Sequence, residues 1–576
     1  MTLRTRAILR IRIITTVILT LAVILVARLY QIQVLNHDQY VARAEQQYVH
    51  TVQDVYDRGS IFMTTREGER VSAATVRGGY VLAVDPTVLT DVAAAWTAIA
   101  PHVQLDEALF RTRATLPDRT YVELAEALPE EAANAIAAAD IDGLFLYQNQ
   151  WRYYPGETLA ARTIGFTGFD ADSPFPTGRY GLERYYEDIL NRDPETLSVD
   201  FFAEIFSTLG DLLVDESDLG GPRPGHIVTS LEPTVSRLLQ QTLEQTNEQW
   251  SSRITGGIIM NPQTGAIYAL DAVPTFDLNN REGASITDFQ NPLVENVYEM
   301  GSIIKPLTVA AGLDAGAIAP NTTYYDSGRL ELDTFTIGNF DGKGRGTVNM
   351  QEVLNQSLNT GVAFIVDTMG KERFREYFLN LKLGSETGID LPNEAFGLVS
   401  NLNSPRDVEY ATASFGQGIA LTPVGTVRAL STLANGGRLV TPHLVQHVEY
   451  EDGTLRDVTY PNDQQVFSSE TSEEISRMLT SVVDDALRNG TVALPNHTIA
   501  AKTGTAQIAD SVNGGYYDDR YLHSFFGYFP AYNPEFLVFL YTVEPKGVRY
   551  ASETLTEPFM DITRFLINYY AVAPDR

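Results

Sequence analysis

Hydropathy divides the chain into one apolar run near its start and a long remainder of shorter patterns. Residues 13–27, "IITTVILTLAVILVA", carry no charge, and a mostly apolar pattern continues past one arginine to residue 35. A helix needs about 20 apolar residues to cross a bilayer, and a flanking arginine side chain can reach the interface. We therefore predict a membrane anchor over 13–35. A cleaved signal peptide is the alternative, because the uncharged run is short.

Arginines are concentrated on one side of this run, within residues 1–12. Positive residues favour the cytoplasmic side of a membrane helix. We predict a cytoplasmic tail over 1–12 and a single pass through the plasma (inner) membrane. The rest of the chain is then extracytoplasmic.

The pattern after the anchor predicts two folded regions. In the first, β-like runs such as 80–86 ("YVLAVDP") alternate with helical ones such as 89–103. The Ala-rich segment 129–140 begins with proline and two glutamates, which suits a first helical turn. The run "DLGGPRPG" (218–225) can continue neither a helix nor an interior strand. We place the border there, with one domain over 36–220 and another over 221–576.

The second domain has β-rich runs at both ends. Residues 256–273 read as a hairpin around the turn "NPQTG", and three further runs follow late in the chain: "TIAAKTGTAQI", "SFFGYFPA" and "FLVFLYTV". The stretch between them is largely helical in pattern. This predicts an α/β (α+β) domain whose sheet joins the two ends of the segment.

Composition excludes several kinds of function. The chain has 576 residues, is 44% hydrophobic and 20% charged, and has a net charge of −31. Such acidity argues against a nucleic-acid partner, because phosphates need clustered positive charge. The absence of cysteine excludes disulfides, thiolate nucleophiles and cysteine-based zinc sites, and the 8 histidines form no paired metal-binding pattern. We predict no metal and no organic cofactor.

The segment "YEMGSIIKP" (298–306) places a serine one helical turn before a lysine. Ser302 and Lys305 would share one helix face. A buried Lys305 would have its ammonium form disfavoured, and could act as the base that a serine nucleophile needs. Gly301 allows close approach to the start of the helix, where backbone N–H groups favour a developing oxyanion.

Two further motifs follow in order, "SLN" at Ser357 and "KTGT" at 502–505. The order S-x-x-K, S-x-N, K-T-G is typical of penicillin-recognising serine enzymes. Ser357 can relay a proton, and Asn359 can hold a substrate amide. Lys502 supplies positive potential for a substrate carboxylate. The candidate catalytic residues are Ser302, Lys305, Ser357, Asn359, Lys502 and Thr505, and the substrate-binding ones are Asn359, Thr503, Gly504 and Thr505.

With these motifs the chain resembles the class B penicillin-binding proteins, the monofunctional peptidoglycan D,D-transpeptidases. The resemblance extends to "TASFGQGIALTPV" (412–424), "SFFGYFPAYNPEFLV" (524–538), and, in the first domain, "DRGSIF", "RYYPGETLAARTIGFTG" and "GRYGLERYYEDIL". The chain departs from the family where Met63, Thr64 and Thr65 replace part of a usual box, and where Ala501 replaces a usual glycine. The "YEMGS" run and the moderate first domain favour the division-type branch over the elongation type.

The resemblance implies a fold, a reaction and partners. The 36–220 region would be a pedestal, and 221–576 a penicillin-binding transpeptidase domain. Ser302 would be acylated by the penultimate D-Ala of a stem peptide, with release of terminal D-Ala, and an amine of a second stem would take the acyl group. The oxyanion would lie between the N–H groups of Ser302 and Thr505. β-Lactams would acylate the same serine. A polytopic lipid II polymerase in the membrane is the implied partner, and lipid II-derived glycan strands carry the substrate.

Two other classes share this set of motifs. A β-lactamase or a D-Ala-D-Ala carboxypeptidase would pass the acyl group to water, and a β-lactamase would normally lack a pedestal. A non-catalytic scaffold or β-lactam sensor would keep the fold. However, a scaffold should have lost a motif residue, and a sensor needs a larger cytoplasmic region than 12 residues.

Overall fold

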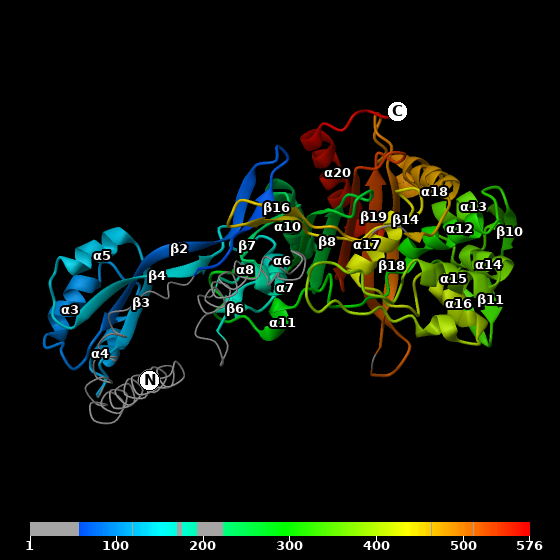
Figure 1. The fold of residues 1–576 in the computed structure, drawn as a ribbon. Helices are drawn as coiled ribbons and strands as arrows, with labels where there is room; N and C mark the ends of the chain where they lie inside the picture. Colours follow the sequence, from blue (N-terminus) through cyan, green and yellow to red (C-terminus); the bar gives the residue numbers. More distant parts are fainter. Residues whose placement is uncertain (1–56, 118, 170–175, 193–222, 462–463, 511) are drawn as a thin grey trace, which may run out of the picture. The chain divides into compact units, whose positions relative to one another are not determined.

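The computed structural model describes residues 57–576, apart from 118, 170–175, 193–222, 462–463 and 511. These residues form two compact units (Figure 1), one from 78–151 and the other from 57–77 together with 152–576. Among the described helices, none is long and apolar enough to cross a membrane. The predicted tail, the anchor over 13–35 and the border at 220 lie outside the described residues and stay predictions.

The described residues of the smaller unit form a short sheet with three helices. Its elements are the part of β2 (Arg70–Val84) from Gly78 onward, α3 (Val92–Ile99), α4 (Glu107–Ala114), β3 (Val122–Leu128), α5 (Glu130–Ala137) and β4 (Leu144–Tyr153). Both β3 and β4 pair with β2. Asp91 and Asp106 cap α3 and α4 by accepting hydrogen bonds from first-turn N–H groups. Helix α3 is shorter than the predicted 89–103, because it starts after its Asp91 cap and stops before Pro101.

In the larger unit, one sheet brings together segments that are far apart in the chain. Strand β1 (Ile61–Thr64) lies between β2 and β7 (Gly225–Thr229), antiparallel to the first and parallel to the second. Strand β7 then pairs with β15 (Val445–Tyr450), which pairs with β16 (Leu455–Asp457). Beside this sheet lie α6 (Ala161–Ile164), β5 (Thr167–Gly168), β6 (Thr177–Gly178), α7 (Gly181–Tyr185) and α8 (Glu187–Leu190).

A buried charge network holds these short elements. The Glu183 carboxylate accepts from Arg58 Nε at 2.6 Å and from Arg152 Nε at 2.5 Å, and all three side chains are at most 3% exposed. Burial alone would raise the pKa of Glu183, but the two guanidinium groups outweigh it and hold the pKa below its ordinary value. The segment around Arg58 is thereby tied to residues after 151.

The second sheet of the larger unit has five antiparallel strands, in the order β18-β19-β20-β8-β9. They are β8 (Ile254–Met260), β9 (Ile267–Val273), β18 (Ala500–Ala509), β19 (Tyr516–Phe529) and β20 (Phe536–Val543). Residues 254–273 thus share one sheet with residues 500–543. The prediction of a mixed α/β domain whose sheet joins both ends is confirmed.

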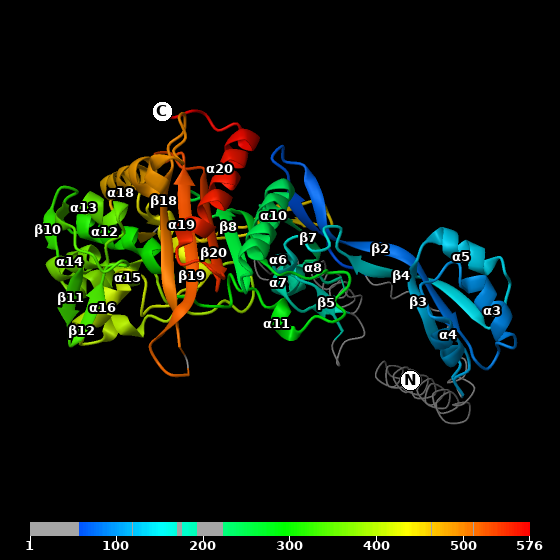
Figure 2. The ribbon, with the colours of Figure 1, turned by 180° about the vertical axis from the view of Figure 1, so that it is seen from behind.

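Both faces of this sheet are covered, which explains the unbroken apolar sequence of β20. Alternate residues enter different cores: Phe539 packs in the core on the helical side, whereas Leu540 packs against the other. The second core includes α10 (Pro233–Trp250) and α20 (Thr556–Tyr570), which lie beside the sheet in both views (Figures 1 and 2). The motif residues lie on the other side, where most of the helices are.

Although Val483 and Leu487 pack into the second core, the remaining elements of the larger unit lie mostly on the helical side. They are α11 (Ile286–Phe289), a 3₁₀ turn (Gly301–Ile304), α12 (Lys305–Asp314), β10 (Thr323–Asp326), β11 (Arg329–Leu332), β12 (Phe335–Gly338), β13 (Gly346–Asn349), α13 (Met350–Asn355), α14 (Asn359–Met369), α15 (Lys371–Asn380), a 3₁₀ turn (Ser400–Asn403), α16 (Asp407–Ala413), α17 (Pro423–Ser431), β14 (Arg438–Leu439), β17 (Gln464–Gln465), α18 (Ser469–Ser481), a π turn (Val482–Ala486), a 3₁₀ turn (Leu487–Gly490) and α19 (Ala551–Thr554).

Candidate active site

Ser302 lies in the 3₁₀ turn that leads directly into α12. Gly301 precedes it with φ +66°, and a Cβ at that position would lie 2.8 Å from the Thr505 carbonyl oxygen. The Gly301 N–H donates to the Gly416 carbonyl at 3.1 Å. The turn is therefore pressed between β18 and the loop around residue 416, and only glycine fits at this contact.

Lys305 is fully buried at the start of α12. Its Nζ donates to the Ser357 carbonyl at 2.5 Å and to Ser357 Oγ at 3.1 Å. Among the described residues no carboxylate pairs with it. Burial, and then the nearby charge of Lys502, lower the pKa of Lys305 well below its ordinary value. A neutral amine, the form that can accept a proton, is thus favoured.

Ser357 is the meeting point of the three motifs. Lys305 precedes Ser357 in the sequence and Lys502 follows it, and Lys502 Nζ also donates to Ser357 Oγ at 3.1 Å. Burial lowers the pKa of Lys502 to about 8, so this lysine is mostly charged at neutral pH. One hydroxyl therefore contacts two buried lysines, and burial lowers the pKa of each.

Asn359 begins α14, and its Nδ2 donates to the Gly338 carbonyl at 2.8 Å. Its neighbour Thr360 donates through Oγ1 to Asp326 Oδ1 at 2.8 Å, and Asn339 Nδ2 donates to the same carboxylate. This buried network fixes the start of α14 and with it the position of Asn359.

The K-T-G-T motif occupies the edge strand β18. A Cβ on Gly504 would meet the Met300 carbonyl at 2.8 Å and collide with Ser524 Oγ, so β18 can approach the serine turn only with glycine here. Thr505 Oγ1 accepts a hydrogen bond from the Ala551 N–H at 3.1 Å. The edge strand is thus held on one side by the nucleophile turn and on the other by the start of α19.

A cavity of about 770 Å³ opens at this point. Six of the predicted site residues line it: Ser302, Ser357, Asn359, Lys502, Thr503 and Thr505. Lys305 and Gly504 lie beneath its surface, where Lys305 contacts Ser357 and Gly504 contacts the serine turn. The structure therefore brings all eight predicted residues together, and their individual roles stay predictions.

Several lining residues carry no motif and were missed from the sequence. They are cationic or aromatic and come from loops or, for one of them, from the 3₁₀ turn after α18: Phe340, Arg345, Arg488, Arg549 and Tyr550. Glu299, three residues before Ser302, was also missed; it accepts hydrogen bonds from the Gly418 N–H at 3.0 Å and Tyr516 Oη at 3.1 Å. The only sequence signal was the position of Glu299 and Gly418 within quoted family-like segments.

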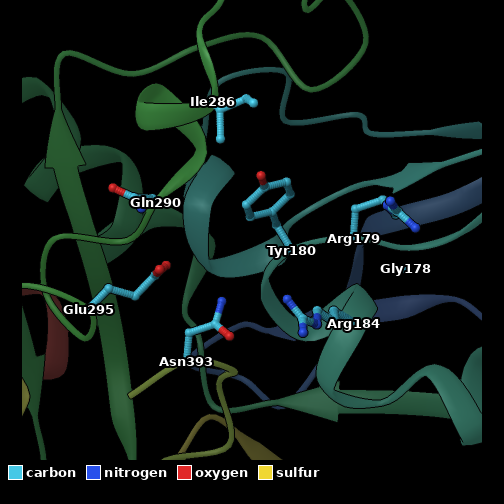
Figure 3. Close-up of a pocket in the computed structure, with 8 residues that line it drawn as sticks. All are labelled: Gly178, Arg179, Tyr180, Arg184, Ile286, Gln290, Glu295 and Asn393. Atoms are coloured by element: carbon cyan, nitrogen blue, oxygen red, sulfur yellow. The ribbon is translucent and has the colours of Figure 1, made fainter. Parts of the chain in front are cut away.

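A second cavity of about 410 Å³ lies elsewhere in the larger unit (Figure 3). Ile286 and Tyr180 lie above Arg184, Glu295 and Asn393 in this view. Burial raises the pKa of Glu295, and the Arg184 guanidinium opposes that rise. None of the predicted site residues lines this cavity, so it is separate from the cleft of the three motifs.

Comparison with known proteins gives a match over the region that contains the three motifs. A family model described as the penicillin binding protein transpeptidase domain matches residues 255–563, more than half of the chain. The chain belongs to this family.

Two relatives that align with most of this chain have names that agree with this family. Stage V sporulation protein D of Bacillus subtilis is 30% identical over 442 residues, which cover 75% of this chain and 66% of that protein, just under two thirds. The peptidoglycan D,D-transpeptidase FtsI homolog of Mesostigma viride is 29% identical over 494 residues, covering 80% of this chain and 79% of that one.

Solved structures share the fold. Penicillin binding protein 2X from Streptococcus thermophilus superimposes with a TM-score of 0.71 at 20% identity, covering 90% of this chain and 81% of that chain. The resemblance inferred from the sequence is thus confirmed: the chain is a class B penicillin-binding protein and, by family, a serine-type D,D-transpeptidase.

Proposed function

We propose that this penicillin-binding protein cross-links peptidoglycan stem peptides through an acyl-enzyme on Ser302. The observation that carries the assignment of roles is the contact of two buried lysines with Ser357 Oγ, beside a cavity that Ser302 lines. Neutral Lys305 takes the proton of Ser302 as its Oγ attacks the carbonyl carbon of the penultimate D-Ala. In the structure Lys305 bonds to Ser357, and catalytic contacts commonly tighten only on substrate binding.

The tetrahedral intermediate then collapses with proton transfer to the leaving group. Its oxyanion lies between the N–H groups of Ser302 and Thr505. Ser357 passes a proton, held by Lys305, to the amine of the departing D-Ala, and the C–N bond breaks. The amine of a second stem peptide attacks the resulting ester, and the same relay in reverse returns the proton to Ser302.

The remaining motif residues position the donor peptide. Charged Lys502 and the hydroxyls of Thr503 and Thr505 hold the terminal carboxylate, and Asn359 holds a peptide amide through its donor and acceptor. Gly504 leaves room for the peptide to lie extended along β18. A β-lactam enters as a mimic of acyl-D-Ala-D-Ala and stops at the acyl-enzyme, because its leaving amine stays attached.

Membrane attachment and a partner belong to the same proposal. Residues 13–35 anchor the chain with its N-terminus in the cytoplasm, 36–220 form the pedestal, and a polytopic lipid II polymerase supplies glycan strands beside the anchor. The supports are the arginine-rich 1–12 segment and the apolar run that follows it. Co-purification of the full chain with such a polymerase, and its loss when 13–35 is replaced by an unrelated anchor, tests the partnership.

Intact-mass spectrometry of the full chain after incubation with benzylpenicillin tests the nucleophile. We expect one penicilloyl group on the peptide that contains Ser302, persisting for many minutes. Ser302→Ala should abolish the adduct, whereas Ser285→Ala, at an exposed helix cap, should keep it. An adduct retained in Ser302→Ala would refute the assignment.

The fate of the acyl group separates the alternatives. Rapid loss of the adduct with hydrolysed drug would indicate a β-lactamase, and D-Ala release without acceptor incorporation would indicate a carboxypeptidase. No adduct on folded protein would indicate a scaffold. Each outcome contradicts the transpeptidase proposal in a distinguishable way.

A further inference from the structure

The cleft has the opposite charge balance to the rest of the chain. The chain contains 73 Asp and Glu against 42 Lys and Arg, yet four cationic residues line the cavity: Arg345, Arg488, Lys502 and Arg549. Within the described part of the chain, no aspartate or glutamate lines it. Walls of one sign favour a ligand of the other.

Two of these cations are already neutralised by side chains behind the cavity wall. Arg345 binds Asp341 through two hydrogen bonds of 2.7 and 2.9 Å. Arg488 binds Glu557 at 2.6 Å. The proposed function assigns Lys502 to the terminal carboxylate of the donor peptide. One guanidinium is left for another anionic group.

That guanidinium belongs to Arg549, in the loop between β20 and α19. Among the described residues no ion pair or side-chain hydrogen bond holds it, and its Cζ lies 5.6 Å from the ring centroid of Tyr550. Tyr550 itself meets Phe340 edge to face at 5.8 Å. The cation is thus exposed over an aromatic surface at the cavity wall and can reorient toward a ligand.

The loop is fastened beside the catalytic strand. Thr505 faces His523 across the β18–β19 pair, and the His523 ring contacts the Arg549 carbonyl at 3.0 Å. The Ala551 N–H bonds to Thr505 Oγ1, as described above. Arg549 therefore lies next to Thr505, where the proposed oxyanion forms.

The direction in which the donor peptide lies along β18 decides which of its groups is beside Arg549. With the terminal carboxylate at Lys502 and Thr503 and the scissile carbonyl at Thr505, the acyl side of the donor extends toward Gln507, which also lines the cavity. Beyond the methyl group of the penultimate D-Ala, the next side chain on that side belongs to the third stem residue. A carboxylate there would lie within the region that Arg549 can sweep.

We propose that Arg549 binds a second carboxylate on the acyl side of the donor, so that the site selects stem peptides whose third residue is a dicarboxylic diamino acid over those with lysine. The proposal rests on the transpeptidase function assigned above and specifies its substrate class. A guanidinium suits a carboxylate because its planar N–H groups can form paired hydrogen bonds.

Two penicillins that differ by one carboxylate test this directly. Carbenicillin is benzylpenicillin with an added carboxylate on its acyl side chain, so the ratio of their acylation rate constants isolates that group. In the full chain we expect Arg549→Gln to lower the carbenicillin-to-benzylpenicillin ratio by ~10-fold, as for one charge-assisted hydrogen bond. Arg549→Lys should restore part of the ratio, because the charge is kept.

Lys546→Gln is the control, since Lys546 lies in the same loop, is exposed and does not line the cavity. It removes the same charge and should leave the ratio unchanged. A ratio unchanged in Arg549→Gln, or lowered equally in Lys546→Gln, would overturn the proposal. Absence of any benzylpenicillin adduct on the unsubstituted chain would instead overturn the transpeptidase function, and with it this assignment.

Discussion

Lys305 and Lys502 contact the same Ser357 hydroxyl, and the proposed function gives them opposite roles, a neutral base and a charged anchor. Burial lowers both pKa values, and the charge of Lys502 lowers that of Lys305 further. The more depressed lysine suits a base, and the less depressed one suits a carboxylate anchor. Serine hydrolases that use histidine as the base likewise assign proton transfer and substrate binding to different groups.

This division predicts a bell-shaped pH dependence for acylation by benzylpenicillin. The rate should rise as pH increases through the lowered pKa of Lys305, because the proposed mechanism uses its neutral amine as the base. It should fall above about 8, as Lys502 loses its proton and its attraction for the drug carboxylate. The second-order rate constant, measured at constant ionic strength, gives both limbs.

Lys502→Arg separates the two limbs. A guanidinium stays charged over the whole range, so the alkaline fall should disappear while the acid limb stays. An alkaline fall that persists unchanged in this variant would show that Lys502 is not its source.

At the residue scale, the sequence predicted the motif residues because their chemistry follows local spacing. Ser302 and Lys305 are one turn apart, and the K-T-G-T residues are contiguous. Arg549 and Arg345 could not be predicted in the same way. They lie in loops whose position against the cavity depends on the tertiary fold, and an isolated arginine carries no signal.

At the element scale, the serine turn and β18 meet through glycines. We predict that Gly301→Ala slows benzylpenicillin acylation strongly, for two reasons. Alanine would have to adopt the φ of +66° that Gly301 has, and its Cβ would lie 2.8 Å from the Thr505 carbonyl oxygen. The φ penalty alone is ~1–2 kcal/mol. The contact should additionally displace Ser302 from β18, the strand to which the proposed function assigns the second oxyanion donor.

Gly316→Ala provides the control for this effect. Gly316 has the same φ of +66°, and a Cβ there would meet nothing within 4 Å. It should lower the unfolding temperature but leave the acylation rate intact. If both variants slowed acylation equally, strain rather than the contact with β18 would be responsible.

Elements with a strong pattern were predictable, and those defined by pairing were not. The runs of β8, β9 and β20 are apolar enough to indicate strands. Strand β2 begins at Arg70, well before the predicted 80–86, because its first half mixes polar and small apolar residues without a continuous apolar run and gains its structure by pairing with β1. The short strands β11 and β12 pair with each other, and their few apolar residues, such as Leu330 and Ile337, pack in or against the core but are too sparse to indicate strands from the sequence alone.

At the scale of the whole molecule, stability of the larger unit depends on a few buried charges. We predict that Glu183→Gln lowers its free energy of unfolding by ~3–5 kcal/mol, because two buried guanidinium groups lose their shared partner. Urea unfolding measures the change. Glu474→Gln, which removes an exposed pair with Arg477, should cost under ~1 kcal/mol.

The difference in free energy of unfolding between the wild-type chain and Glu183→Gln should depend on pH, because the pKa of Glu183 is lowered. A carboxylate with a lowered pKa stabilises the fold above its unfolded-state pKa, and this contribution is lost as pH falls through the folded value. The gap between the wild-type chain and Glu183→Gln should therefore narrow on acidification. If this difference in free energy grew on acidification, Arg58 and Arg152 would not be stabilising the charged form of Glu183.

The pairing of β1 with β7, and of β7 with β15, has a consequence for biosynthesis. The smaller unit comes from one continuous stretch, so it can fold as soon as that stretch has left the ribosome and any translocation channel. Strand β1 emerges earlier but cannot complete its sheet until β15 follows, most of a chain length later. Strand β1 can pair with β2 as soon as both have emerged, but the other edge of this pair stays open until β7 and then β15 arrive, so a chaperone that covers a strand edge would help most during that interval.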